Sequence, residues 1–178
     1  MWWCSMRHQW TKRLVTLSLL LAMAIILGYL ESLIPSFGIP GVKIGLANIV
    51  ILLCVINFKY YESFAILILR ILVVSLILGT FLQVSFFMSL AGGLFSFIVM
   101  FVLSKLSKNL SYVFISISGA ISHSIGQIIV ALIVTSTVEV FYYLPFILLL
   151  SIPTGILTGI IAKRISKLKI MEDLSEKE

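Results

Sequence analysis

Charged residues are scarce in this chain of 178 residues: they make up only 11%, whereas an average soluble domain has about 25%. Hydrophobic residues account for 61%, and the mean hydropathy is +1.19. A chain this small cannot bury so much apolar surface in one aqueous core, because the buried fraction of the surface falls with chain size. The composition therefore excludes a soluble globular domain. It also excludes a disordered chain, which needs low hydrophobicity and high net charge.

Aspartate and cysteine are almost absent: the chain has one aspartate, Asp173, and two cysteines, Cys4 and Cys54. No DDxxD-like cluster exists to hold the Mg²⁺ that chemistry on prenyl diphosphates typically uses. The cysteines have no CxxC spacing, and they predict neither a disulfide framework nor a zinc site. The sequence also lacks a P-loop and a GxSxG elbow. We therefore expect no enzymatic activity of its own, no bound metal and no cofactor.

Apolar segments dominate what is present, and a transmembrane helix needs about 20 mostly apolar residues. Six segments qualify as candidates, at 14–30, 46–58, 63–78, 86–103, 112–134 and 144–161. The second is short and covers only about 20 Å at 1.5 Å per residue. The preceding stretch, 35–45, has two prolines and three glycines, which disfavour a continuous helix. The pattern predicts an all-α polytopic membrane protein of six transmembrane helices.

Basic residues are distributed unequally between the predicted loops. With six spans, eleven of the thirteen lysines and arginines fall on one side, Lys43 alone falls on the other, and Arg70 lies within a span. The positive-inside rule then places both termini in the cytoplasm, in a multi-pass protein of the cell membrane. The predicted organisation is a basic cytoplasmic N-terminus at 1–13, a six-helix transmembrane domain at 14–161 and a charged cytoplasmic tail at 162–178. The net charge of +6 reflects this orientation and predicts no binding to nucleic acid.

Arg70 lies near the middle of the third segment, eight residues from Glu62 and eight from Leu78. A charge at that depth costs about 2.5–3.5 kcal/mol on insertion scales and usually faces a cavity or a partner. Since guanidinium offers a planar fork to carboxylate or phosphate, one interpretation is an anchor for an anionic substrate. The other interpretation is a structural ion pair with Glu31 or Glu139.

The fifth segment carries small and polar residues at intervals of three and four, which predicts one packed helix face. That face comprises Ser116, Gly119, Ser122, His123, Gly126, Gln127 and Ala131. The opposite, lipid-facing side is predicted to comprise Ile121, Ile125, Ile128 and Leu132. His123 and Gln127 either contact a substrate or only form hydrogen bonds between helices. Further small residues at 24/28, 91–93 and 155/159 predict close helix packing, more often within the bundle than with another protein.

Three polar residues flank the predicted external loop: Glu31, Lys43 and Asn48. In the functional interpretation, the loop at 35–45 carries Lys43 as a lid over an outward-opening cavity that Arg70 and His123 also reach. Pockets between helices are common ligand positions. In the simpler interpretation, Glu31 and Lys43 form a solvated interfacial pair worth under about 1 kcal/mol.

Several stretches, taken in order, resemble one protein family. They are 31–35 (ESLIP), 40–48 (PGVKIGLAN), 69–71 (LRI), 79–81 (GTF), 89–93 (SLAGG) and 119–127 (GAISHSIGQ). They resemble the Gx transporter family, also called heptaprenyl diphosphate synthase component I, and the resemblance covers roughly 12–169. The signature residues carried onto this chain are Glu31, Lys43, Asn48, Arg70, His123 and Gln127.

The family is similar to the S components of energy-coupling factor (ECF) transporters, which are small six-helix proteins that bind a vitamin-like ligand from outside. The resemblance implies a substrate-binding subunit that captures a small anionic ligand and works with a separate transmembrane subunit and ATPases. One alternative is a non-catalytic membrane subunit beside a heptaprenyl diphosphate synthase in isoprenoid or menaquinone synthesis. Another is a component of a flavin-based extracellular electron-transfer system with a flavoprotein partner.

Overall fold

The computed structural model describes residues 2–33, 45–106, 110–136, 142 and 144–167. Six α-helices and no strand occur among these residues, which confirms the all-α prediction. The helices are α1 (Trp2–Leu33), α2 (Leu46–Asn57), α3 (Tyr60–Ile77), α4 (Val84–Leu106), α5 (Tyr112–Thr135) and α6 (Leu144–Ser166). Five of these described helices are long and apolar enough to cross a membrane, and the exception is α2.

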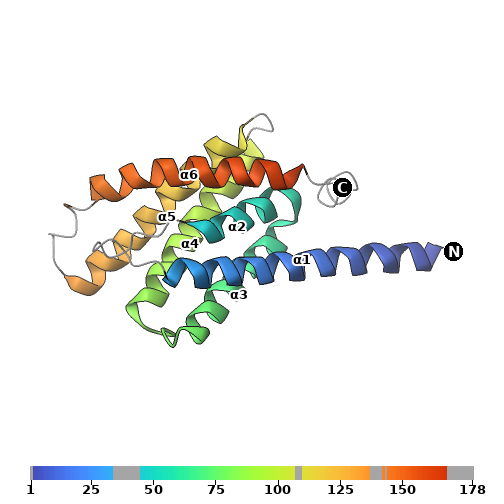
Figure 1. Cartoon of the computed structure of the whole chain (residues 1–178), viewed down its shortest axis with the longest axis horizontal. Coiled ribbons are helices and arrows are strands. Elements are labelled where there is room, and N and C mark those ends of the chain that lie inside the picture. Colours follow the sequence, from blue (N-terminus) through green and yellow to red (C-terminus); the bar gives the residue numbers. More distant parts are fainter. Residues whose placement is uncertain (1, 34–44, 107–109, 137–141, 143, 168–178) are drawn as a thin grey trace.

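The helix α2 has 12 residues, so it is about 18 Å long. It contacts each of the other five helices and lies in the middle of the bundle in Figure 1. Nearly all of its residues are buried, including Leu53 and Cys54, which have no exposed surface. A helix that is hydrophobic on all sides is a buried one. The predicted second span is therefore a core helix that the protein itself surrounds.

Consecutive helices run back and forth, so the beginning of α1 and the end of α6 lie at the same end of the bundle (Figure 1). The described basic residues at helix ends, among them Lys59, Lys105 and Lys163, also belong to this end. The helix α1 has 32 residues and extends beyond the other helices here. The predicted N-terminal region 1–13 is therefore, over its described residues, a continuation of α1.

Small residues allow the helices to approach each other closely. A Cβ atom added at Gly126 of α5 would lie 2.8 Å from the carbonyl oxygen of Ala91 in α4, and one added at Gly159 of α6 would lie 2.6 Å from Cα of Val113 in α5. Ala24 is fully buried. The small residues predicted at 24/28, 91–93 and 155/159 thus pack within the bundle, as favoured from the sequence.

The prediction of which side of α5 faces the lipid was partly wrong. Ile128 is buried, whereas the strongly exposed apolar residues of α5 include Phe114 and Ile133. The reason is that α5 packs against two helices rather than one. Its glycines face α4, while Ser116 and Ser124 face α6, where their hydroxyls form hydrogen bonds of 2.6 Å with Thr158 and Ser151 respectively.

We predict that Gly126→Leu destabilises the bundle, because its side chain would meet the backbone of α4, which cannot move aside. Overpacking of this kind typically costs about 1–3 kcal/mol. Ile129→Leu, on the exposed side of the same helix, serves as the control. Thermal unfolding of both variants in detergent, followed by circular dichroism, should show a lower Tm for Gly126→Leu alone. Equal Tm values would refute the close α4–α5 contact.

Candidate functional site

Most buried polar side chains of the bundle form hydrogen bonds, either with the backbone of their own helix or with a side chain of a neighbouring helix. Asn57 donates to the carbonyl oxygen of Leu53 over 2.8 Å, and Ser75 donates to that of Leu72 over 2.8 Å. Three side chains instead have a buried polar atom with no hydrogen-bond partner among the described residues. These atoms are Nη1 of Arg70, Oγ of Ser96 and Nε2 of Gln127. Such atoms mark the place in this bundle where a partner is missing.

Arg70 of α3 is only 8% exposed. Its predicted structural pair with Glu31 is not formed as a direct contact: the one ion pair within 4 Å between described residues joins Arg13 and Glu62. The carboxylate of Glu31 interacts with the guanidinium electrostatically from farther away. The other predicted acid, Glu139, lies outside the described residues. The positive charge of the guanidinium is thus buried, and among the described acids none lies close enough to form an ion pair with it.

His123 and Gln127 of α5 lie together against α4, as the helical spacing predicted. A Cβ atom added at Gly92 would lie 2.9 Å from both Cγ of Gln127 and Cε1 of His123. Both side chains are buried, at 7% exposure for His123 and 2% for Gln127. The absence of a side chain at Gly92 therefore creates the space that these two polar side chains occupy.

The next residue of α4, Gly93, faces α3. A Cβ atom added there would lie 3.0 Å from Cδ1 of Leu67 and 3.1 Å from Cδ1 of Ile71. Arg70 directly precedes Ile71, so it belongs to the segment of α3 that packs on this turn of α4. The glycine pair thus brings α3 and α5 against two sides of one helical turn, with Arg70 on one helix and His123 and Gln127 on the other.

Ser96 lies one turn farther along α4 and was missed by the sequence analysis. It is 1% exposed, and its Oγ would lie 3.2 Å from a Cβ atom added at Gly119 of α5. The signal that could have found it is its spacing of three and four residues from the glycine pair at 92–93. Its hydroxyl thus lies between α4 and α5 without a hydrogen-bond partner among the described residues.

Glu31 and Asn48 belong to a separate cluster at the beginning of α2. The carboxylate of Glu31 accepts a hydrogen bond from the backbone N–H of Gly45. Gly45 has φ of +79°, a left-handed conformation that favours glycine, and its carbonyl oxygen accepts from the N–H of Asn48 over 2.9 Å. Glu31 thus ties the end of α1 to the beginning of α2. Lys43 lies outside the described residues, so its predicted pairing with Glu31 stays a prediction.

The buried polar atoms that lack a hydrogen-bond partner among the described residues indicate which chemical groups would fit this site. The N–H groups of Arg70 and Gln127 are donors, and a buried donor left without an acceptor costs about 1–3 kcal/mol. An acceptor-rich anion, such as a carboxylate or a phosphate, has the complementary chemistry. No group of three His, Cys, Asp or Glu side chains occurs within the described residues.

We predict that Glu31→Gln weakens the attachment of α2 to α1. A hydrogen bond to a charged acceptor is worth about 1.5–3 kcal/mol, and a neutral amide retains only part of it. Hydrogen–deuterium exchange should accelerate at Leu46–Asn48 and stay unchanged in α5. Thr16→Val, which removes a hydroxyl that bonds only within α1 over 3.0 Å, is the control. Unchanged exchange at the beginning of α2 would show that the Glu31 contact does not stabilise it.

The comparison with known proteins bears on the family of this chain. A family model described as heptaprenyl diphosphate synthase component I matches residues 20–165, from within α1 to within α6. No curated protein and no solved structure shows a significant match to the chain. The match covers all six stretches that carry the resemblance described above, and it includes the described polar residues of both clusters. The chain therefore belongs to the heptaprenyl diphosphate synthase component I family.

Proposed function

We propose that this membrane protein is a substrate-binding subunit that captures a small anionic ligand from outside for an energy-coupled uptake transporter. The observation that carries the proposal is the buried guanidinium of Arg70, whose Nη1 has no hydrogen-bond partner among the described residues. A charge in a membrane helix costs about 2.5–3.5 kcal/mol and usually serves a function. An anion that enters the bundle would offset this cost.

The ligand would contact groups from three helices. Arg70 supplies positive charge from α3, while Gln127 of α5 and Ser96 of α4 offer polar atoms that have no partner within the described part of the chain. His123 lies beside Gln127 against Gly92 and would help to orient the ligand. Asn48, in the first turn of α2, would help to orient the ligand, and Glu31, near the end of α1, would hold the beginning of α2 in place. In this proposal the stretch at 35–45, with Lys43, opens and closes access from outside.

Energy for uptake would come from partner subunits, namely a transmembrane protein and ATPases. This division of labour follows from the sequence, which contains no P-loop. The chain would then bind and release its ligand without changing it chemically. The resemblance to S components of ECF transporters supports this arrangement.

A second function is favoured by the description of the family, which names a component of heptaprenyl diphosphate synthase. In that case the chain would be a non-catalytic membrane subunit beside a soluble, aspartate-rich synthase. A diphosphate group would suit the same donors, Arg70 and Gln127, because it is rich in acceptor oxygens. The role in flavin-based electron transfer stays a prediction from the resemblance.

We predict that Arg70→Leu abolishes anion binding without unfolding the protein, because leucine removes the charge and fits an apolar interior. A ligand at 100 times its Kd stabilises its protein by about 2.7 kcal/mol. Native mass spectrometry of the purified protein should therefore detect a retained anion in the wild type and none in the variant. Thermal unfolding with added inorganic phosphate or diphosphate should show a rise in Tm only for the wild type.

Arg164→Leu is the matched control, since Arg164 lies in the last turn of α6 and is exposed. This variant should keep the retained anion and the rise in Tm. If Arg70→Leu binds the anion as the wild type does, Arg70 is not part of the site and the proposal fails.

The two candidate functions differ in the partner that they require. We predict that the affinity-tagged protein, extracted in mild detergent, carries a transmembrane protein and ATPases with it. Mass spectrometry of the eluate identifies them. The control is an unrelated membrane protein that carries the same tag and is extracted in the same detergent. Recovery of a prenyl synthase in place of ATPases, with loss of prenyl product on deletion, would favour the second function.

A further inference from the structure

Aromatic rings line the seam between α3 and α4. We call Tyr60, Phe64, Phe97 and Phe101 the aromatic seam. The ring centroids of Phe64 and Phe97 lie 5.7 Å apart, those of Tyr60 and Phe101 lie 6.2 Å apart, and Phe97 stacks on Phe101 at 6.2 Å. The seam is therefore continuous along both helices over about one turn.

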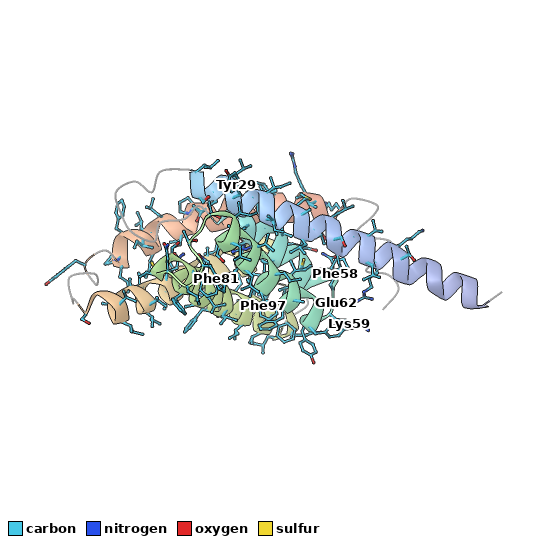
Figure 2. All side chains as sticks on the ribbon, turned by 90° about the horizontal axis from the view of Figure 1, so that it is seen from below. Tyr29, Phe58, Lys59, Glu62, Phe81 and Phe97 are labelled. Atoms are coloured by element: carbon cyan, nitrogen blue, oxygen red, sulfur yellow. The ribbon has the colours of Figure 1, made fainter. Side chains whose placement is uncertain are left out.

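The seam reaches the protein surface. Tyr60 is 63% exposed and Phe64 is 42% exposed, whereas Phe97 is buried beneath them. Aromatic side chains with one polar end are enriched where a membrane meets water, because one end of the ring system is apolar and the other is wet. In Figure 2, Phe97 lies between Phe81, toward one end of the bundle, and Lys59, toward the other. The seam thus runs from the basic end toward the middle of the membrane-spanning part.

Two exposed lysines stand at the basic end of the seam. Lys59 directly precedes Tyr60, and Nζ of Lys105 lies 5.9 Å from the centroid of the Phe101 ring. The contact between Tyr60 and Phe101 brings the two lysines to the same part of the surface. Their positions combine two positive charges with a row of rings.

The nearest acid on these elements, Glu62, is already engaged. Its carboxylate accepts two hydrogen bonds from Arg13, over 2.9 and 2.8 Å, and a third from the backbone N–H of Lys59 over 3.0 Å. Neither Lys59 nor Lys105 forms an ion pair with a described acid. Their charges are therefore available to an anion that approaches from outside the protein.

The spacing of charges and rings along the bundle matches a phospholipid. Phe64 follows Lys59 by five residues, which is about 7.5 Å along α3, and Phe97 precedes Lys105 by eight residues, about 12 Å along α4. A lysine at a helix end extends its ammonium to the headgroup level. Rings at these depths then lie beside the upper part of the acyl chains.

We infer that Lys59, Lys105 and the aromatic seam form a binding site for an anionic phospholipid. The phosphate would lie between the two ammonium groups, and an acyl chain would lie on the exposed ring of Phe64, which Phe97 supports from beneath. A zwitterionic lipid fits less well, because its own cationic group would face the lysines. This inference does not depend on the proposed function, since it concerns neither Arg70 nor a transported ligand.

The test is a lipid titration of the full chain by native mass spectrometry, with phosphatidylglycerol and phosphatidylcholine as probes. An anionic surface attracts each lysine by about 1 kcal/mol, so Lys59→Gln with Lys105→Gln should lower the preference for phosphatidylglycerol about 30-fold. The matched control is Lys163→Gln with Arg164→Gln, at the same end of the bundle but on α6. The control should keep the wild-type preference.

A second variant separates the rings from the charges. Phe64→Ala with Phe101→Ala should weaken retention of both lipids while the ratio between them stays within about twofold, because the lysines remain. An equal loss of preference in the α6 control would overturn the inference, since general charge attraction would then suffice. So would an unchanged preference in the lysine variant. A dimer that depends on Phe64 and not on lipid would assign the seam to a second copy of the chain instead.

Discussion

A positive charge buried in an apolar bundle is the constraint on which the rest of this structure depends. Arg70 is placed by α3, and its guanidinium has a buried nitrogen with no hydrogen-bond partner among the described residues. A bundle that neutralised this charge directly would place a carboxylate within 4 Å, but Glu31 instead accepts from the backbone of Gly45. The one described acid of α1, Glu31, thus holds the beginning of α2, and Nη1 of the guanidinium is left without a hydrogen-bond partner among the described residues.

The glycine pair in α4 determines which helices surround that charge. Gly92 and Gly93 admit α5 on one side and α3 on the other, at distances that a side chain would prevent. In a membrane, helices associate through close packing and hydrogen bonds, because lipid tails are as apolar as leucine. The same contact that holds the bundle together therefore brings the polar residues of α3 and α5 to adjacent sides of one helical turn. Stability and the candidate site share one set of residues here.

The helix α2 is shorter than the other five helices because it is surrounded by protein. Its residues contact every other helix, so its length is not set by membrane thickness. A short core helix leaves room at its beginning, where Gly45, Asn48 and Glu31 form their own polar cluster. The protein thus has two polar groups, one at the beginning of α2 and one between α3, α4 and α5.

Composition and periodicity alone determined the all-α membrane fold, the approximate helix bounds and the choice of Arg70, His123 and Gln127 as the polar residues of the interior. These features follow from local chemistry, because a long apolar segment is stable as a helix in lipid and a polar or charged residue within such a segment is costly. Only the tertiary structure decided that α2 is surrounded by protein, that Ile128 is buried and that Ser96 belongs with the interior polar residues. These outcomes depend on which helices pack against each other, and a spacing of three or four residues defines a helix face without naming its neighbour.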